Sequence, residues 1–384
     1  MSQAKTIALI GVSSYARMIL RCLRRAITSG DYKLAAVVVI NPVEEAETCR
    51  ELEATGCRIY GDYRTMLREW SGRLDLCIVP TSIHWHKPMT LDALAAGANV
   101  LVEKPLAGSV AEGRAILDAA HAAGKFVAVG FQDMYGPVVW ELKDWLLSGQ
   151  AGPIESVHVT GSWPRHHDYY TRNDWAGRLQ CGGRPVYDSP LNNAFAHFVN
   201  LALFLSGSER HEAAEIQNVS GNLWRFYPIE TFDTARVCCR SREGVPIHIA
   251  LTHVDVESVA PRIVVRLRDG EVAWTHDQDA VFRGLEGQVL HRWAIPTGEV
   301  KQETMLREVL SSLTTGLAPR CPAALAMRHL EVIAQLHAQL PIREGAETFP
   351  ELEALRSGPW ESIPGLLPRL EESPSMAVAA ISHK

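Results

Sequence analysis

The triplet Glu103-Lys104-Pro105 is the part of the sequence whose residue types most directly suggest chemistry. It follows the apolar run Val100–Val102, which is typical of a buried strand, so the lysine would stand at a strand end. An ammonium group there can stabilise negative charge that develops on an oxygen, and burial can lower its pKa toward a range useful for proton transfer. The alternative interpretation is an ordinary solvated lysine at a strand end.

A second candidate for proton transfer is Asp188, which follows a pair of glycines. Ser189 and Pro190 have the residue types of a helix start, with serine at the cap and proline in the first turn. They predict a helix over residues 191–205. Asp188 either takes part in chemistry or supports the N-terminus of this helix through the helix dipole.

Polar residues share one face of that predicted helix. At about 100° per residue, Asn193, His197 and Asn200 lie together, opposite an apolar stripe. His197 is therefore a candidate proton-transfer residue, and a tyrosine of residues 163–170 is the alternative. Asn192 and Asn193 are candidates for substrate binding only, because an amide forms hydrogen bonds but does not titrate. The alternative is a solvated polar face.

A turn that could hold a dinucleotide follows the first apolar run, over residues 11–16. Gly11 would allow the tight turn and Ala16 the close helix packing, so that amides at a helix start reach a diphosphate. Ser13 stands where a second glycine is usual, and its hydroxyl could donate to a phosphate. The residues of this turn that we expect to bind the cofactor are Gly11, Ser13, Ser14, Tyr15 and Ala16.

The end of the second predicted strand bears on the choice between NAD and NADP. An acidic residue usually stands there to bind the adenosine ribose, but Asp31 lies at the wrong end of the strand. Asn41 is the candidate ribose ligand. Residues 39–48 contain no Arg or Lys to pair with a 2′-phosphate, and Glu44 and Glu45 would repel one. The charges therefore favour NAD.

The elements that must position these residues fall into two groups. In the first third, short apolar strands alternate with helices, a pattern that predicts a doubly wound parallel sheet with both faces covered. The predicted strands are 6–12, 34–40, 58–60, 74–80, 100–102 and 126–130, and the helices between them include 63–70, 87–96 and 110–123. After a linking helix at 137–149 the pattern changes to alternating strands with tight turns, which predicts a mainly antiparallel sheet. These strands are 156–163, 218–226, 235–239, 247–254, 263–267 and 271–275, followed by helices 302–315 and 323–340.

Length and composition limit the class of protein. A chain of 384 residues is too long for one ordinary core, so we expect two domains. Lys and Arg number 38 against 44 Asp and Glu, and this balance of −6 argues against a nucleic-acid binder. No apolar run approaches the roughly 20 residues of a membrane span, and no signal-peptide pattern is seen. Eight scattered cysteines favour a reducing compartment, and we predict a cytoplasmic protein without a metal site.

The segment over residues 79–105 resembles the Gfo/Idh/MocA family of oxidoreductases. It begins V-P-T-S-I-H-W-H-K-P and ends A-G-A-N-V-L-V-E-K-P. The resemblance continues through Gly130-Phe131-Gln132 and through Cys321–His337, so that it covers roughly residues 5 to 340.

The resemblance implies an α/β protein with an N-terminal Rossmann domain and a C-terminal α+β domain whose large open sheet faces a sister subunit. We accordingly expect an NAD(P)-binding domain over 1–135, a substrate-binding and oligomerisation domain over 136–345, and an extended, loosely ordered tail over 346–384. The last helix, 323–340, would pack back near the first domain. A homodimer or homotetramer is implied.

The resemblance also implies hydride transfer between a nicotinamide and a hydroxyl-bearing carbon of a sugar, inositol or related polyol. Glu103 and Lys104 would lie beside the nicotinamide, and Lys104 would donate to the reacting oxygen. Other residues expected along the cofactor cleft are Pro80, Thr81, His84, His86 and Gln132.

The loop after the first strand of the second domain would reach over the nicotinamide in this family. Its aromatic residues, Trp163 among them, could stack on a sugar ring, and Arg165 or His166 could bind a carboxylate or hydroxyl. Adjacent polar residues on an extended chain seldom point the same way, so His166 and its neighbours do not predict a metal site. A plain surface loop is the alternative.

The chain departs from the family at one position. Family members commonly carry a histidine four residues after the aspartate, whereas Asn192 stands there after Asp188. The nearest histidine is His197. Two alternatives to a dehydrogenase follow: an enzyme that cleaves glycosidic bonds by transient oxidation with bound NAD, and a sensor that has kept the fold but lost turnover.

Overall fold

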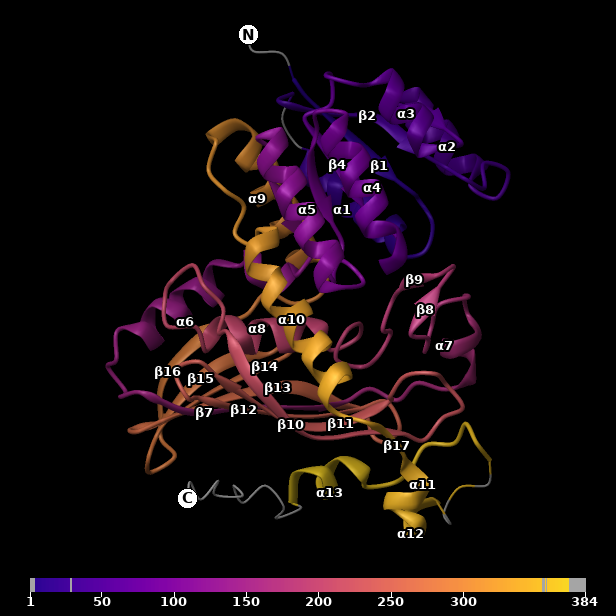
Figure 1. The fold of residues 1–384 in the computed structure, drawn as a ribbon. Helices are drawn as coiled ribbons and strands as arrows, with labels where there is room; N and C mark the ends of the chain where they lie inside the picture. The colour runs from indigo at the N-terminus through magenta and orange to yellow at the C-terminus, as the bar shows by residue number, and fades with distance from the viewer. Residues whose placement is uncertain (1–3, 28–29, 354–355, 357, 373–384) are drawn as a thin grey trace.

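The computed structural model describes residues 4–27, 30–353, 356 and 358–372 and contains two large sheets (Figure 1). The first has six strands, all parallel, in the order β3-β2-β1-β4-β5-β6, which confirms the predicted doubly wound sheet. Its strands are β1 Lys5–Ile10, β2 Tyr32–Val38, β3 Arg58–Tyr60, β4 Leu76–Val79, β5 Asn99–Val102 and β6 Val127–Val129. Its helices are α1 Tyr15–Ala26, α2 Ala46–Ala54, α3 Tyr63–Glu69, α4 Ile83–Ala95 and α5 Val110–Ala123. Helix α2 was not predicted.

Local sequence explains why these elements begin and end where they do. Ile7 and Leu9 of β1 are completely buried, as expected of a strand covered on both faces by helices. Helix α5 begins after Ser109, whose side chain accepts a hydrogen bond from the Glu112 N–H, and ends at Gly124 in the left-handed conformation. The observed bounds of α5 are the predicted ones. Helix α4 was predicted over 87–96, but it begins four residues earlier, at Ile83, directly after Ser82.

The second sheet has nine strands in the order β16-β15-β14-β13-β7-β12-β11-β10-β17. Only β7 with β12 and β10 with β17 pair in parallel, so the sheet is mainly antiparallel, as predicted. Its strands are β7 Ile154–Ser162, β10 Ile216–Arg225, β11 Thr234–Ser241, β12 Pro246–Thr252, β13 Val259–Leu267, β14 Gly270–Thr275, β15 Asp279–Gly284, β16 Val289–Ala294 and β17 Ile342–Glu344. The sequence patterns did not reveal β15, β16 and β17. A small hairpin adds β8 Gln180–Cys181 and β9 Arg184–Pro185.

Helices α6 Pro137–Leu147, α8 Ala196–Leu205 and α10 Ala323–Gln339 pack against one face of this sheet (Figure 1). Helix α9 Val300–Thr315 packs against η1 Gln132–Tyr135 and against α1 of the first domain. The short α7 His167–Thr171 lies beside the hairpin of β8 and β9 (Figure 1). In α8 every residue except His197 is buried, so this helix lies in the core. No helix in the described ranges combines the length and apolar character needed to cross a bilayer.

The predicted helix over 191–205 begins later than expected. Residues 189–195 form irregular turns, in which the Asn193 N–H donates to the Ser189 oxygen and the Phe195 N–H donates to the Pro190 oxygen. Helix α8 therefore starts at Ala196, and the expected cap at Ser189 with Pro190 in the first turn is wrong. The consequence is that Asn192 and Asn193 lie in a turn, outside the helical periodicity assumed for them.

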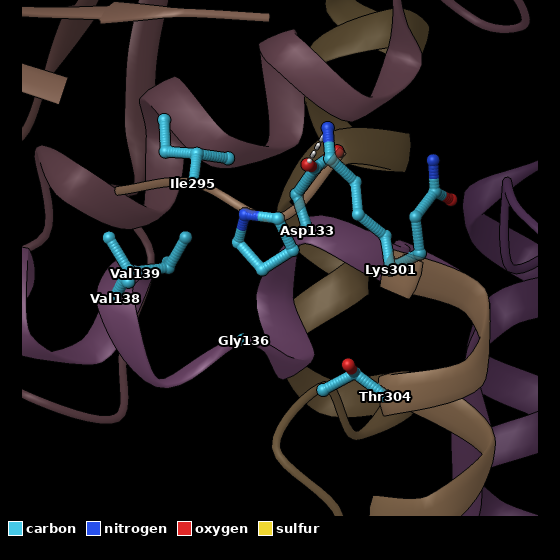
Figure 2. A pocket seen from close by; sticks show the side chains of 9 residues that line it. Asp133, Gly136, Val138, Val139, Ile295, Lys301 and Thr304 are labelled. Atoms are coloured by element: carbon cyan, nitrogen blue, oxygen red, sulfur yellow. Dashed lines mark ion pairs between the residues drawn. The ribbon is translucent and has the colours of Figure 1, made fainter. Parts of the chain in front are cut away.

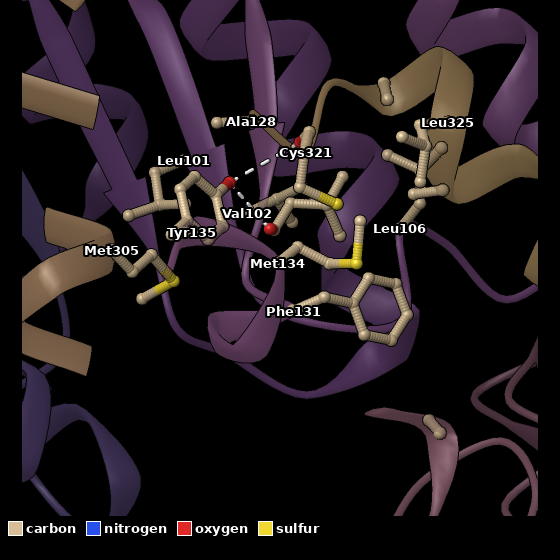
Figure 3. Close-up of a cluster of buried hydrophobic side chains, with 14 of the residues drawn as sticks. Leu101, Val102, Leu106, Ala128, Phe131, Met134, Tyr135, Met305, Cys321 and Leu325 are labelled. Atoms are coloured by element: carbon tan, nitrogen blue, oxygen red, sulfur yellow. Dashed lines mark hydrogen bonds between the residues drawn. The ribbon is translucent and has the colours of Figure 1, made fainter. Parts of the chain in front are cut away.

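The two sheets are joined by a buried junction rather than by a loose linker. The Val129 N–H donates to the Cys321 oxygen at 2.9 Å, just before α10 begins. The Tyr135 hydroxyl donates to the Val129 oxygen at 2.8 Å, and Leu101 and Met305 pack around it (Figure 3). Helix α10 then packs against α5, as the sequence suggested for the last helix. The end of the first sheet is thus tied by hydrogen bonds to η1 and to the segment that precedes α10.

The C-terminal segment differs from the extended, loosely ordered tail that we expected over 346–384. Its described part contains α11 Gly345–Thr348, α12 Pro350–Glu353 and α13 Leu366–Glu372. Leu366 and Leu370 are buried in a small cluster with Trp224 and Ala250 on the sheet face opposite α8 and α10 (Figure 1). The apolar spacing of these leucines, which the prolines obscured, explains the difference. Residues 373–384 lie outside the described part of the chain.

Candidate active site

Lys104 lies at the carboxyl end of β5, where the loops of both sheets converge. Its Nζ donates to the backbone oxygen of Asn193 at 2.8 Å and to the Asn193 Oδ1 at 3.0 Å. Burial lowers the pKa of Lys104, while the negative charges of Glu103 and Asp188 act in the opposite direction. The lysine is therefore positioned and desolvated, with two neutral oxygens as its hydrogen-bond acceptors.

Asn193 connects this lysine to a carboxyl group. Its Nδ2 donates to the Asp188 Oδ1 at 2.8 Å and to the Tyr169 hydroxyl at 3.2 Å. The Asp188 Oδ2 accepts the Gly177 N–H at 2.7 Å. Asp188 is only 3% exposed, and its burial raises its pKa. Asp188, Asn193 and Lys104 therefore form one connected network, as their selection from the sequence anticipated.

Tyr169 closes this network from the loop that follows β7. Burial raises its pKa to about 12, and the charge of Asp188 adds to the shift. The Arg172 guanidinium lies over the Tyr169 ring, 3.7 Å from its centroid, and lowers the pKa of Asp188. Sequence analysis named a tyrosine of residues 163–170 as the alternative to His197 and did not assign a role to Arg172.

His197 projects from the first turn of α8 toward the same region. Burial lowers its pKa, and the positive charges of Lys104 and Lys301 lower it further, so the imidazole is neutral. Its Nδ1 is buried without a hydrogen-bond partner, and its ring contacts Phe131 edge-on, with centroids 5.7 Å apart. A neutral imidazole with an unused nitrogen beside a buried lysine can accept a proton.

Asn192 does not join the network that its neighbour forms. Its Nδ2 donates to the backbone oxygens of Val186 at 3.0 Å and Tyr187 at 3.2 Å, and it lines a separate cavity. The prediction that Asn192 contacts the substrate is therefore not supported by its surroundings. Asn192 and Asn193 lie in the turns that precede α8, and there the Asn193 side chain reaches Lys104 while the Asn192 side chain bonds to the backbone of Val186 and Tyr187.

The two histidines of the fourth strand end behave differently. His86 is completely buried, and its ring nitrogens lie 2.7 Å from the Pro105 oxygen and 2.9 Å from the Thr81 oxygen. Burial lowers its pKa to about 4 and outweighs the two carbonyls. His86 thus ties two loops together instead of facing a cofactor, contrary to expectation. His84 is half-buried, and its Nδ1 has no partner.

The turn after β1 has the backbone that a dinucleotide site needs. Gly11 has φ +100°, and an added Cβ there would meet the Ala16 Cβ at 3.6 Å, so glycine is required by conformation. Ser14 also adopts positive φ, at 52°. The Ser13 hydroxyl donates to the Glu45 Oε1 at 2.8 Å, and Arg17 lies 2.6 Å from the same oxygen.

Glu45, which the sequence analysis considered only as a charge opposed to a 2′-phosphate, lies directly against this turn. It precedes α2, its side chain is buried to 7% exposure, and hydrogen bonds from Ser13 and Arg17 lower its pKa. Asn41, the expected ribose ligand, is exposed and donates to Glu44 at 3.1 Å. The carboxylate closest to the glycine turn therefore comes from the start of a helix that was not predicted.

Unused polar atoms mark the opposite part of the crevice. The Thr81 Oγ1 and the Gln132 Oε1 are buried without partners, at the ends of β4 and β6. Between them lies Glu103, whose pKa burial raises to about 7 against the opposing effect of Lys104. An added Cβ at Gly130 would lie 2.5 Å from the Glu103 Oε1, so this carboxyl group occupies space that only glycine leaves free. These atoms fit a bound group that carries amides and hydroxyls.

The substrate-binding candidates of the loop after β7 divide into two groups. Trp163 is half-buried and stacks on Phe195, with ring centroids 4.8 Å apart, so much of its surface is used in packing. Arg165 is half-buried over Tyr169, and its Nε is buried without a partner. His166 is exposed and precedes α7. Among the described residues, no three His, Cys, Asp or Glu side chains gather to form a metal site.

A doubly wound sheet with a glycine turn, followed by an α+β domain whose loops meet a strand-end lysine, defines a two-domain dinucleotide-binding protein. Comparison with known proteins is more specific. Residues 5–131 match the model of the Gfo/Idh/MocA oxidoreductase family with its NAD-binding Rossmann fold, and residues 139–273 match the C-terminal domain of the same family. The chain belongs to the Gfo/Idh/MocA family.

Curated relatives match over part of the chain. An inositol 2-dehydrogenase of Paracoccus denitrificans is 33% identical over 139 residues, which are 35% of this chain and 40% of that protein. A dTDP-3,4-didehydro-2,6-dideoxy-α-D-glucose 3-reductase of Streptomyces violaceoruber is 26% identical over 40% of this chain and 44% of that protein. The matched part thus spans about two fifths of the length of these relatives.

Solved structures share the fold over most of the chain. A WlbA dehydrogenase of Chromobacterium violaceum in complex with NADH and UDP-GlcNAcA superposes with a TM-score of 0.69 at 21% identity. The match covers 88% of this chain and 94% of that one. A 3-ketoreductase of Actinomadura kijaniata in complex with NADP and TDP-benzene gives 0.70 at 16% identity, over 89% and 99% of the two chains.

Proposed function

We propose that this chain is an NAD(P)-dependent oxidoreductase that acts on a hydroxyl or carbonyl carbon of a sugar, inositol or related polyol. The observation that carries the proposal is the buried ammonium group of Lys104, held by Asn193 at 2.8 and 3.0 Å beside Asp188. The family membership and the relatives that are inositol or sugar dehydrogenases support it.

The residues that would hold the cofactor line the crevice from β1 to β6. Amides of the turn at Gly11–Ala16 would hold the diphosphate, and the unused Thr81 and Gln132 oxygens could accept hydrogen bonds from the amide or hydroxyls of the cofactor. When bound, NAD(P) supplies a nicotinamide ring that exchanges hydride with the substrate carbon. Glu103 and Lys104, at the end of β5, bring carboxyl and ammonium groups to the same end of the crevice.

Lys104 is the group that we assign to the reacting oxygen. Its Nζ uses two neutral acceptors, both on Asn193, so one N–H remains for a substrate oxygen. A desolvated ammonium stabilises alkoxide charge more strongly than a solvated one. Asn193 and Asp188 position it, and the buried Asp188 carboxyl keeps negative charge near the lysine through Asn193.

We assign proton transfer to His197 rather than to Tyr169. The neutral His197 imidazole has an unused nitrogen, whereas the hydroxyl of Tyr169, with a pKa of about 12, releases its proton less readily. On oxidation, the substrate hydroxyl would pass its proton to this imidazole while Lys104 stabilises the oxygen.

We further propose a preference for NAD over NADP. The Glu45 carboxylate lies against Ser13 of the dinucleotide turn, where its negative charge opposes a 2′-phosphate. Arg17, the nearest cation, is already paired with Glu45 at 2.6 Å. A cytoplasmic homodimer or homotetramer, with the outer face of the large sheet as the interface, completes the proposal.

The test combines cofactor binding with turnover. Purified protein titrated with NADH and NADPH should quench or enhance nicotinamide fluorescence, and a screen of inositols and sugars should then show reduction of the oxidised cofactor. Failure of both nucleotides to bind would refute the proposal. Tightly retained NAD without net reduction would indicate instead an enzyme that acts by transient oxidation, and ligand binding without any turnover would indicate a sensor.

A further inference from the structure

A second cavity, of about 350 Å³, lies on the other side of the turn that carries Asp188 and Asn193. Its walls come from the start of α5, the middle of α10 and the turn residues Tyr187 and Asn192. Its lining contains none of the residues Lys104, Asp188, Asn193 and His197. Its volume lies within the range of small-molecule sites, which begins at about 300 Å³.

An unsatisfied amide oxygen marks this cavity as more than a packing gap. Asn192 is 1% exposed, and its Nδ2 hydrogens go to the carbonyl oxygens of Val186 and Tyr187. Those two bonds fix the orientation of the amide and leave its Oδ1 buried without a donor. The His337 Nε2, on α10, is likewise buried without a partner. Two such atoms on one cavity wall are costly unless a ligand satisfies them.

The start of α5 supplies the complementary donors. The N–H groups of Val110 and Ala111 open the helix and have no acceptor within it, whereas the next N–H, of Glu112, already bonds to the Ser109 Oγ. All of these residues except Glu112 line the cavity. A ligand oxygen placed there would satisfy the helix end while a ligand O–H or N–H reaches Asn192.

The charges around the cavity favour an uncharged ligand. No lining residue is a lysine or arginine, and burial lowers the pKa of His337 to about 4, so its ring is neutral at pH 7. The Glu112 carboxyl group lies beside the rim, where its Oε2 accepts the Gly108 N–H at 3.1 Å. It would oppose an anion at the helix start.

The remaining wall is apolar and includes two rings in contact. Tyr187 and His337 have ring centroids 4.6 Å apart, and the aliphatic side chains of Leu330 and Ile333 extend the same wall. Such a wall matches the C–H face of a saturated ring, whose edge hydroxyls would meet Asn192 and the helix start.

We propose that this cavity is a second binding site for a neutral hydroxylated ring, such as a pyranose or a cyclitol, separate from the site at Lys104. The rim is preformed, because an added Cβ at Gly108 would lie 1.9 Å from the Pro185 oxygen, so the two segments are already in contact. Ligand binding therefore requires no closure of the two domains.

The test uses saturation-transfer NMR with myo-inositol and D-glucose as neutral probes. D-glucuronate, a ring of similar size that carries a carboxylate, is the charged comparison. Ala334 lines the cavity from an exposed position of α10, so Ala334→Phe fills the space without disturbing the core. Ala122→Phe is the control, because Ala122 is also exposed and helical but lies outside the lining. Thermal melts establish that both variants fold.

We expect at least one neutral ring to bind the natural protein and Ala122→Phe equally, and to bind Ala334→Phe about tenfold more weakly or not at all. Because these rings are also candidate substrates of the Lys104 site, both variants are also compared in the Lys104→Met background. Any binding left at the Lys104 site is common to the two variants there, so the difference between them reports this cavity. Equal binding to Ala334→Phe and the natural protein, absence of binding by both neutral rings, or tighter binding of D-glucuronate would each overturn the proposal. These outcomes do not depend on turnover, so they stand apart from those that test the oxidoreductase.

Discussion

Lys301 is buried and Lys104 is half-buried, and the partners of their ammonium groups differ. The Lys301 Nζ lies 2.9 Å from the Asp133 Oδ1 and 2.8 Å from the Asp277 Oδ1, at the start of α9 (Figure 2). The Lys104 Nζ contacts only the amide and carbonyl oxygens of Asn193. Carboxylates raise the pKa of Lys301 despite its burial, whereas burial lowers the pKa of Lys104. The charge of Lys301 is compensated by two carboxylates, whereas the charge of Lys104 meets only neutral oxygens at hydrogen-bond distance.

The comparison shows that the partners of a desolvated lysine determine whether its charge stabilises the fold or remains available for chemistry. The Lys301 cluster joins η1, α9 and the turn after β14, and so holds the junction between the two sheets. The ammonium group of Lys301 is engaged by two carboxylates, so it is not available to a substrate oxygen. The Lys104 ammonium retains unused donor capacity in a desolvated site, which is the condition for differential stabilisation of a transition state.

Replacement of Lys104 is expected to have the largest effect, on turnover. Lys104→Met should lower kcat for polyol oxidation by about 10²- to 10⁴-fold, because the developing alkoxide loses its ammonium partner. NADH affinity, measured by fluorescence titration, should change far less. A loss of turnover smaller than threefold would show that Lys104 does not contact the reacting oxygen.

Replacement of Lys301 should instead lower stability. Lys301→Met leaves the buried Asp133 carboxylate unpaired, and breaking a buried pair costs about 3–5 kcal/mol. Urea unfolding followed by fluorescence measures this free energy. The double variant with Asp133→Asn should recover much of the loss, and Lys104→Met should unfold at or above the natural denaturant concentration. A variant pair with the opposite behaviour would reverse the roles assigned to the two lysines.

The contrast between the lysines could not be read from the sequence, although most of the first sheet could. Strands β1 to β6 follow apolar runs, and the caps of α5 are local, so nearby residues suffice to predict them. The bond from Lys104 to Asn193 joins residues 89 positions apart, and the ion pair of Lys301 with Asp133 is equally non-local. Such contacts depend on how two sheets meet, which local periodicity does not encode.

The turn before α8 shows in more detail what local periodicity cannot predict. Ser189 and Pro190 have the composition of a helix start, yet the turns through Phe195 delay α8 and send Asn192 and Asn193 in different directions. His197 lies in the first turn of α8, whereas Asn193 precedes the helix. The misplacement of Asn192 came from assigning helical periodicity to an irregular segment.

The two lysines should also respond oppositely to pH. The raised pKa of Lys301 means that its stabilising contribution is complete below the ordinary value of 10.5 and is lost as pH rises through the folded-state pKa. The stability gap between the natural protein and Lys301→Met should therefore narrow above that pH. The lowered pKa of Lys104 predicts that Lys104→Met gains most relative to the natural protein below the folded-state pKa of this lysine, and that the gain fades as pH rises from there to the ordinary value of 10.5. Unfolding curves between neutral and alkaline pH measure how the free energy of unfolding of each variant changes with pH relative to the natural protein. The same pH dependence for both variants would contradict the roles assigned to the two lysines.

The smallest expected effect concerns Glu45, whose charge is compensated almost as fully as that of Lys301 but at the edge of the cofactor crevice. Glu45→Gln removes the carboxylate from Ser13 and releases Arg17 from its 2.6 Å ion pair, so a 2′-phosphate meets a cation instead of an anion. The ratio of NADP to NAD affinity should rise by about three- to tenfold, since a solvent-screened charge has only a modest effect on a neighbouring phosphate. Glu44→Gln, a neighbouring carboxylate that is exposed and bonds to Asn41, is the matched control. Equal ratios for the two variants would mean that Glu45, like Lys301, serves the fold rather than the choice of cofactor.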